Sequence, residues 1–189
     1  MPRPATLPTL DWQAVFESGL DYAAWLAAAE SAEQRDKLEA QRAAIRLEPQ
    51  VAGFLAALPR PVHVVAIAED WCGDVVRHLP VLQRMAEASP MLKVRTIGRQ
   101  QWPEVFVRFL TNGGEAIPKF IFLSDRFVEC GHWGPMPEAC RELIARGKAC
   151  GDVAAARRKV TALYEADGTR REVVRELLRL VDVAASREP

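Results

Sequence analysis

The sequence predicts an α/β fold with a mixed central sheet and helical extensions at both ends. Residues 62–68 form a continuous apolar, β-branched run interrupted only by His63, which is typical of a strand covered on both faces. Strand-like and helix-like segments alternate after this run. They end in two strand-like segments joined by a turn at residues 124–126, which predicts an antiparallel pair at one edge of the sheet.

Residues 1–60 are expected to form a helical N-terminal extension. Apolar residues recur on one face of residues 11–30, and Asp11 is a suitable N-cap for a helix there. Residues 31–47 and 51–58 read as two further helices, the second closed by prolines. We expect these helices to cover the sheet or one of its edges, because an open edge strand invites association.

Residues 61–150 are expected to form the core, and residues 151–189 to form helices that pack on it. The strands expected in the core are residues 62–68, 92–97, 119–123 and 127–133, and the helices are residues 74–88, 103–110 and 137–145. Helices are then expected over residues 153–165 and 169–185, the latter with an apolar stripe. The whole chain is long enough for one globular domain with a sizeable core.

Composition and charge exclude several classes of function. The 189 residues include 25 Lys and Arg and 25 Asp and Glu, so neither a nucleic-acid partner nor an anionic membrane surface is expected. We find no secretory leader and no apolar run of membrane-spanning length, so a cytoplasmic protein is expected.

The four cysteines are Cys72, Cys130, Cys140 and Cys150. They are too scattered for a disulfide framework or a zinc site, so no metal is expected.

Cys72 lies in the motif that most clearly indicates a reactive residue. This motif is the segment Trp-Cys-Gly-Asp-Val-Val-Arg-His-Leu-Pro at residues 71–80. The segment follows the buried strand and opens a helix, whose exposed backbone N–H groups can stabilise a thiolate. Glu69, Asp70 and Asp74 oppose a thiolate. Asp74 either complements the helix dipole or takes part in substrate choice. We interpret His78 as a surface or packed residue rather than a catalytic base.

Two segments resemble the thioredoxin superfamily. Trp71, Cys72, Gly73 and Pro80 match the family's Trp-Cys-Gly-Pro-Cys motif and its helix proline. The segment Ala-Ile-Pro-Lys-Phe-Ile-Phe-Leu at residues 116–123 is similar to the strand that begins at a cis-proline facing the active cysteine. The resemblance spans about residues 62–145 and implies a thioredoxin-like fold, a cis bond between Ile117 and Pro118, and redox chemistry at Cys72.

The chain departs from the family's dithiol pattern at two positions. Val75 stands where the resolving cysteine is expected, although the motif is otherwise close to Trp-Cys-Gly-Asp-Cys. The resemblance also implies a buried carboxylate six residues before Cys72, and that position is Ala66. Cys130, expected opposite about Phe120 and near the cis-proline, is the best candidate for a replacement thiol, although we favour a buried structural cysteine there.

These observations leave two hypotheses for the function. The first is a monothiol oxidoreductase in which Cys72 attacks a protein or low-molecular-weight disulfide and an external thiol such as glutathione resolves the product. The second is a redox-inactive thioredoxin-fold module that binds a protein segment. No cofactor is expected beyond a thiol co-substrate. The residues expected to bind the substrate are Trp71, Gly73, Asp74, Ile117 and Pro118.

Overall fold

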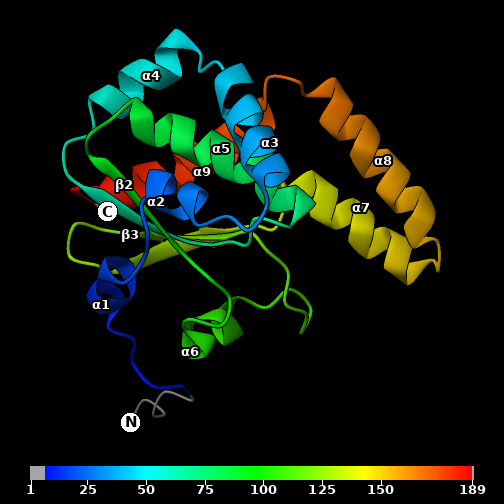
Figure 1. Ribbon diagram of the computed structural model, residues 1–189, viewed down its shortest axis with the longest axis horizontal. Coiled ribbons are helices and arrows are strands. Elements are labelled where there is room, and N and C mark those ends of the chain that lie inside the picture. Colours follow the sequence, from blue (N-terminus) through cyan, green and yellow to red (C-terminus); the bar gives the residue numbers. More distant parts are fainter. Residues whose placement is uncertain (1–6, 189) are drawn as a thin grey trace.

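The computed structural model describes residues 7–188 and contains the mixed sheet that the sequence predicts (Figure 1). The strands are β1 (Val62–Ile67), β2 (Leu92–Ile97), β3 (Lys119–Leu123) and β4 (Glu129–Trp133), in the spatial order β2-β1-β3-β4. β1 and β2 are parallel, whereas β3 is antiparallel to both β1 and β4. Every side chain of β1 and β3 is buried, as expected for central strands.

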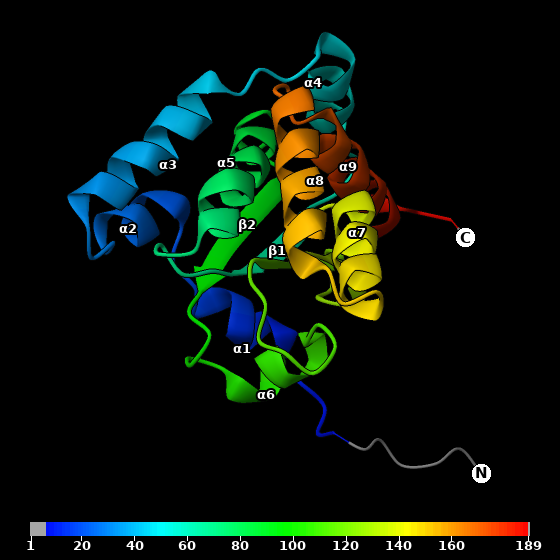
Figure 2. The same cartoon turned by 90° about the vertical axis from the view of Figure 1, so that its right-hand side faces the viewer.

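Helices cover both faces of this sheet. α5 (Gly73–Glu87) connects β1 to β2 and lies on one face beside α9 (Arg171–Ala185), which contacts β1, β3, β4 and α5. On the opposite face lie α1 (Trp12–Glu17), α6 (Pro103–Phe106) and the short 3-10 helix η1 (Val107–Phe109) (Figure 2). The hydrophobic core therefore occupies both sides of β1 and β3.

The N-terminal extension closes the β2 edge of the sheet. The single helix expected over residues 11–30 is instead α1 and α2 (Tyr22–Ala27), separated by an extended residue, Leu20. Leu20 pairs with Thr96 of β2 through backbone hydrogen bonds of 2.8 and 2.9 Å. A Cβ at Gly19 would lie 2.8 Å from the Cβ of Arg95, so glycine permits this close approach. The side chain of Asp21 then caps α2.

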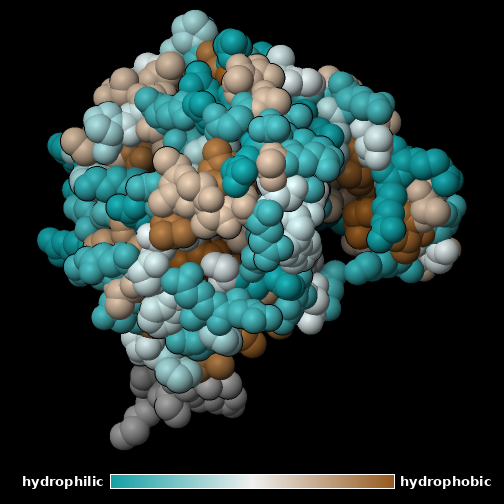
Figure 3. All heavy atoms as spheres, viewed as in Figure 1, coloured by the Kyte–Doolittle hydropathy of each residue, from teal (hydrophilic) through white to brown (hydrophobic). Residues whose placement is uncertain are grey.

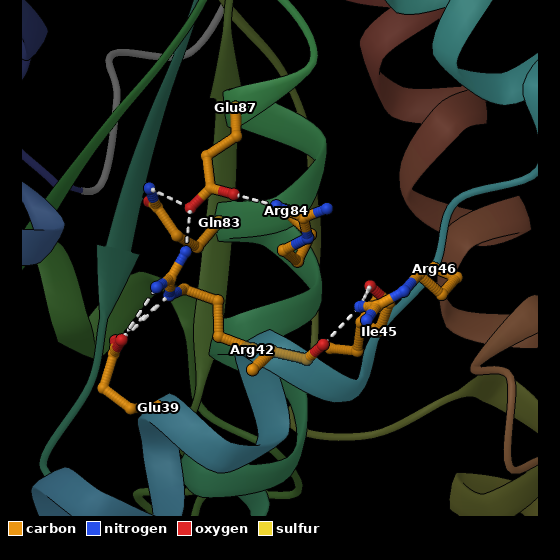
Figure 4. A network of polar contacts seen from close by, with 8 residues as sticks. Glu39, Arg42, Ile45, Arg46, Gln83, Arg84 and Glu87 are labelled. Atoms are coloured by element: carbon orange, nitrogen blue, oxygen red, sulfur yellow. Dashed lines mark hydrogen bonds and ion pairs between the residues drawn. The ribbon is translucent and has the colours of Figure 1, made fainter.

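The next two helices of the extension follow α2, and the first of them packs on α5. α3 (Ala32–Ala44) and α4 (Pro49–Ala56) correspond to the helices expected over residues 31–47 and 51–58. Arg42 of α3 lies between Glu39 and Glu87, with N···O distances of 2.8 and 2.9 Å, and Arg84 also contacts Glu87 (Figure 4). These side chains are partly exposed, so the network fixes the position of α3 more than it stabilises the fold.

Two helices near the C-terminus form a projecting hairpin. α7 (Glu138–Ala149) and α8 (Val153–Ala166) pack closely on each other and extend away from the sheet (Figure 1). A Cβ at Gly147 would lie 2.5 Å from the Cβ of Ala156, so glycine allows the helices to approach. Of the two helices expected to pack on the core, α9 lies on the sheet, whereas α8 packs mainly on α7. None of the helices within residues 7–188 is long and apolar enough to cross a lipid bilayer.

Candidate functional site

Cys72 lies where β1 ends and α5 begins, facing the start of β3. It is the N-cap residue of α5, and its side chain is partly exposed. The thiol donates a hydrogen bond to the carbonyl oxygen of Ile117, with an Sγ···O distance of 3.6 Å. The bond between Ile117 and Pro118 is cis, which confirms the conformation that the sequence predicts. Segments 45 residues apart in the sequence therefore meet at the sulfur.

Trp71 and Gly73 form an exposed rim around this sulfur. The side chain of Trp71 is 56% exposed, and the guanidinium carbon of Arg99 lies 5.1 Å from its ring centroid. A Cβ at Gly73 would contact nothing within 4 Å among the described residues, so the backbone is open to an approaching molecule. Arg99, which the sequence reasoning missed, also contacts Glu69 and Glu115, at N···O distances of 3.8 and 3.1 Å.

The acidic residues near Cys72 are directed toward other partners. A Glu69 oxygen accepts a hydrogen bond from the backbone N–H of Arg99 at 2.8 Å. Asp70 accepts one from the backbone N–H of Glu30 at 2.9 Å. Both carboxylates are therefore paired with N–H donors or a guanidinium rather than directed at the sulfur of Cys72.

Asp74 is held by a residue from the projecting hairpin. The hydroxyl group of Tyr164 in α8 donates to Oδ1 of Asp74 at 3.3 Å, and Nε2 of His78 lies 3.2 Å from the same hydroxyl. The guanidinium of Arg77 lies over the Tyr164 ring. Burial raises the pKa of Asp74. Tyr164 and Arg77 carried no signal in the sequence, since the contact joins residues 90 positions apart.

His78 is packed inside the protein, which is one of the two alternatives, surface or packed, that the sequence favours over a catalytic base. Its side chain is fully buried, and its ring meets Trp133 and Tyr164 edge to face, with centroid distances of 5.2 and 5.4 Å. Burial, together with the nearby charges of Arg77 and Arg170, lowers the pKa of His78 to about 3. The imidazole is therefore neutral at neutral pH.

The neutral state of His78 predicts a loss of stability in acid. The folded protein takes up this proton only near pH 3, whereas the unfolded chain takes it up near the ordinary value of 6.5. The free energy of unfolding should therefore fall as the pH drops from 6.5 toward 3, by up to about 1.4 kcal/mol per pH unit from this group. Urea titrations at several pH values should give a shallower pH dependence for His78→Gln.

His132 provides the control for this measurement, because it lies at the exposed surface of β4. His132→Gln should change the slope less than His78→Gln does. An unchanged slope in the His78→Gln variant would contradict the assignment of this proton to His78.

Cys130 does not lie beside the cis-proline, and the expected register was wrong. Trp133, not Cys130, pairs with Phe120, and Glu129 pairs with Leu123, with a register shift between them. The turn is longer than expected because Phe127 adopts a left-handed backbone conformation, with φ of 58°. Cys130 therefore lies near the turn, at the end of β3 away from Pro118. Burial raises its pKa, which also disfavours a role as a replacement thiol.

Lys119 joins the segments on either side of Pro118. It is 3% exposed, and its Nζ donates to Oγ1 of Thr111 at 2.7 Å and to the carbonyl oxygen of Gly134 at 3.1 Å. Burial, with the nearby charge of Arg141, lowers the pKa of Lys119 to about 8. This lysine was not recognised from the sequence, where it reads as one polar residue in an apolar strand.

Gly134 packs against the cis-proline segment, and we expect substitution there to be costly. Its φ is 118°, and a Cβ at this position would lie 2.1 Å from the carbonyl oxygen of Pro118. Gly134→Ala should lower the free energy of unfolding by about 2 kcal/mol or more, since both the backbone and Pro118 must move. Denaturant unfolding measures this change.

Gly53→Ala is the matched control for Gly134→Ala. Gly53 lies in α4, and a Cβ there would meet nothing within 4 Å among the described residues. Alanine at this helical position should stabilise the protein by about 0.5 to 1 kcal/mol. Equal effects of the two substitutions would contradict the close approach of Gly134 to Pro118.

No cluster of three or more His, Cys, Asp or Glu side chains that could hold a metal ion occurs within residues 7–188. Cys140 is buried, and burial raises its pKa to about 11. Val75 is fully buried in the first turn of α5, so the position of the usual second cysteine is filled by an apolar side chain.

Comparisons with known proteins agree with the fold. A family model described as thioredoxin matches residues 19–155. The structure is similar to the crystal structure of a protein of unknown function from Pseudomonas aeruginosa, with a TM-score of 0.72 and 18% identity over 92% of this chain and 98% of that chain. It is also similar to an HIV epitope-scaffold, with a TM-score of 0.69 and 17% identity over the same shares.

No curated protein matches the chain. At these identities the similarity to the two solved structures concerns the fold alone. The family match covers most of the chain, including the cysteine motif and the cis-proline segment. The chain belongs to the thioredoxin family.

Proposed function

We propose that the protein is a thiol-disulfide oxidoreductase that uses Cys72 as its single catalytic cysteine. The observation that carries this proposal is the position of the sulfur, which is partly exposed at the start of α5 and 3.6 Å from the carbonyl oxygen of Ile117. A helix N-terminus stabilises a thiolate, and the thiolate is the nucleophile in disulfide exchange. The exposed ring of Trp71 and the bare backbone at Gly73 leave this sulfur accessible.

The reaction requires an external thiol to resolve the mixed disulfide, because Val75 supplies none. The thiolate of Cys72 attacks one sulfur of a substrate disulfide, a mixed disulfide forms, and the other sulfur leaves as a thiolate that takes up a proton. An external thiolate then attacks the mixed disulfide, restores Cys72, and becomes disulfide-bonded to the substrate fragment. One turnover therefore converts the substrate disulfide and one external thiol into one free substrate thiol and one new mixed disulfide, and no sulfur of the protein remains oxidised. Release of the second substrate thiol requires a second external thiol.

We propose glutathione or a similar low-molecular-weight thiol as the resolving partner, and protein or low-molecular-weight disulfides as substrates. Trp71, Gly73, Asp74, Ile117 and Pro118 would surround the attacked disulfide. A pool of reduced thiol is needed for turnover, so we propose that the protein works in the cytoplasm, where such a pool is maintained.

Mass spectrometry after incubation with glutathione disulfide tests this proposal. We expect one glutathione to attach to Cys72 rapidly at neutral pH and to be released by added thiol. Cys140 should remain unmodified because it is buried and its pKa is raised to about 11. Modification of Cys150, which is exposed, with none at Cys72 would contradict the proposal and favour a redox-inactive binding module.

A further inference from the structure

Lys119 is the only Lys, Arg, Asp or Glu side chain that is buried within residues 7–188. The other charged side chains reach the surface, and hydrophilic residues make up much of the face shown in Figure 3. The remaining residues of β3 are apolar, so the strand itself does not require a cation. A buried charge is costly unless polar groups meet it. Two groups meet Lys119, the hydroxyl of Thr111 and the carbonyl oxygen of Gly134, at 2.7 and 3.1 Å from Nζ.

Thr111 begins a tight loop that leads to the cis-proline. The backbone groups of Thr111 and Gly114 exchange two hydrogen bonds of 2.9 Å, and the two residues between them have left-handed φ values of 51° and 75°. The N–H of Ala116 then donates to the carbonyl oxygen of Gly114 at 3.0 Å. The loop is therefore held together internally, and a contact that holds Thr111 holds the loop as a unit.

The same loop reaches the surroundings of Cys72 at two points. The carbonyl oxygen of Ile117 lies 3.6 Å from Sγ of Cys72. The carboxylate of Glu115 lies 3.1 Å from the guanidinium of Arg99, which in turn lies over the ring of Trp71. A displacement of the loop would therefore move both the backbone beside the sulfur and a charged partner of the exposed rim.

The second acceptor of Lys119 belongs to the segment that follows β4. Gly134 packs so closely on Pro118 that no space remains for a Cβ. Arg141 of α7 also approaches the carbonyl oxygen of Gly134, but at 3.5 Å, so Lys119 makes the shorter contact. Lys119 thus joins the loop before Pro118 to the segment after β4.

We propose that Lys119 is a positioning residue for disulfide exchange at Cys72. By holding Thr111 to Gly134, it keeps the loop of residues 111–117 where its backbone meets the incoming disulfide beside the sulfur. Lys119 acts through this loop, since its own contacts are with Thr111 and Gly134. The inference rests on the function proposed for Cys72.

Two reactions of Cys72, followed separately by mass spectrometry, test the proposal. Iodoacetamide alkylates the thiolate without needing a docking surface, whereas glutathione disulfide must also fit against the loop. Thr111→Val removes the acceptor at a partly exposed position and keeps the shape of the side chain. The rate constant for glutathionylation should fall roughly threefold to tenfold, the value of one hydrogen bond, while that for alkylation stays the same. Thr111→Ser keeps the hydroxyl and should retain most of the glutathionylation rate.

Lys119→Met removes the other partner of this hydrogen bond. It should slow glutathionylation by at least as much as Thr111→Val does. Adding Thr111→Val to Lys119→Met should cause no further loss, because the contact is already absent. Losses that simply add would contradict a contact between the two side chains. If Lys119→Met fails to fold, the comparison of Thr111→Val with Thr111→Ser decides the proposal.

The pH profile provides an independent readout. Burial, with the nearby charge of Arg141 in α7, lowers the pKa of Lys119 to about 8, and the charge of Lys119 also couples to His132 of β4. The pKa of His132 is lowered, so this residue stays neutral at and above neutral pH, and arginine stays charged. The ratio of glutathionylation to alkylation rates should therefore fall as the pH rises through about 8, since a neutral amine donates weaker hydrogen bonds than an ammonium. Lys119→Met, titrated with the same reagents, should lack this step.

Three results would overturn the proposal. Equal glutathionylation rates for Thr111→Val and the wild-type protein would mean that the contact serves the fold alone. An equal fall in both reactions would place the effect on the thiol itself rather than on the docked disulfide. A wild-type Cys72 that is alkylated but never glutathionylated would refute the function proposed for Cys72, and this inference with it. In the first two results the wild-type protein is still glutathionylated, so the two kinds of failure are distinguishable.

Discussion

Cys72→Ser is expected to reduce turnover of a glutathione mixed disulfide to the background rate set by free glutathione. The sulfur at the start of α5 is the only group we assign as nucleophile, and a serine hydroxyl does not replace a thiolate at neutral pH. Steady-state reduction of a glutathionylated peptide, with glutathione as the second thiol, measures this loss. The effect should be the largest of any single substitution, because it removes the reacting atom.

The Cys72→Ser variant should fold normally, which makes its inactivity informative. Cys72 is the N-cap of α5, and its side chain makes no capping hydrogen bond. Serine is among the preferred N-cap residues, so the helix should be as stable as before or slightly more stable. Denaturant unfolding checks this point.

Cys150→Ser is the matched control for loss of a thiol elsewhere. Cys150 is exposed at the end of α7 and distant in sequence from the motif. This substitution should leave turnover unchanged. Full activity in Cys72→Ser would refute the monothiol proposal. If the wild-type protein also reduces no disulfide above background, the hypothesis of a redox-inactive binding module stands.

The sequence predicts the centre of the fold because the patterns that define it lie within short segments of the chain. The apolar, β-branched run of β1, interrupted only by His63, favours burial on both faces, and the structure buries every residue of it. The position of Cys72 follows from the same run, since the chain must leave a buried strand and enter a helix. Pro118 is predictable in the same way, because a cis peptide bond costs little only before proline. The bond before Pro118 is indeed cis.

Elements whose form depends on distant contacts were predicted less well. The interruption between α1 and α2 arises because Gly19 and Leu20 pack against β2, and no periodicity within residues 11–30 signals that contact. The register of β4 depends on the left-handed conformation of Phe127, which is uncommon for an aromatic residue. The prediction that placed Cys130 beside Pro118 failed for this reason.

The groups that support the candidate site were the least predictable. Tyr164 reaches Asp74 from a hairpin outside the minimal fold, and Lys119 of β3 reaches Gly134, which follows β4, the next strand in the chain. A single tyrosine or lysine in the sequence carries no indication of such a partner. Pairs of this kind become visible only when the elements are packed together.

Val75→Cys is expected to convert the protein into a dithiol oxidoreductase that reduces insulin with dithiothreitol. Val75 is fully buried in the first turn of α5, three residues after Cys72. The Cα atoms of residues i and i+3 in a helix lie about 5 Å apart. This separation is within the range of about 4.4 to 6.8 Å over which a disulfide can form. The new thiol can then attack the mixed disulfide within the same molecule.

The rate of insulin reduction should rise at least about tenfold over the wild-type protein, because the resolving step becomes intramolecular. The gain should remain limited, since Ala66 is fully buried and supplies no carboxylate to assist proton transfer. Val75→Ala is the matched control, as it reduces the side chain without adding a thiol and should give no gain.

The outcomes of this experiment show whether the second thiol is all that the site lacks, or whether the site also no longer admits a protein disulfide. Cysteine is smaller than valine, so the variant should fold without overpacking, at a modest cost in stability. A disulfide between positions 72 and 75 that mass spectrometry detects, together with faster insulin reduction, would mean that only the second thiol was missing. An equal gain in Val75→Ala would instead attribute the effect to loosening of the first turn. A disulfide without any gain would mean that the rim around Cys72 no longer admits a protein disulfide, and the proposed substrates would then be restricted to small ones.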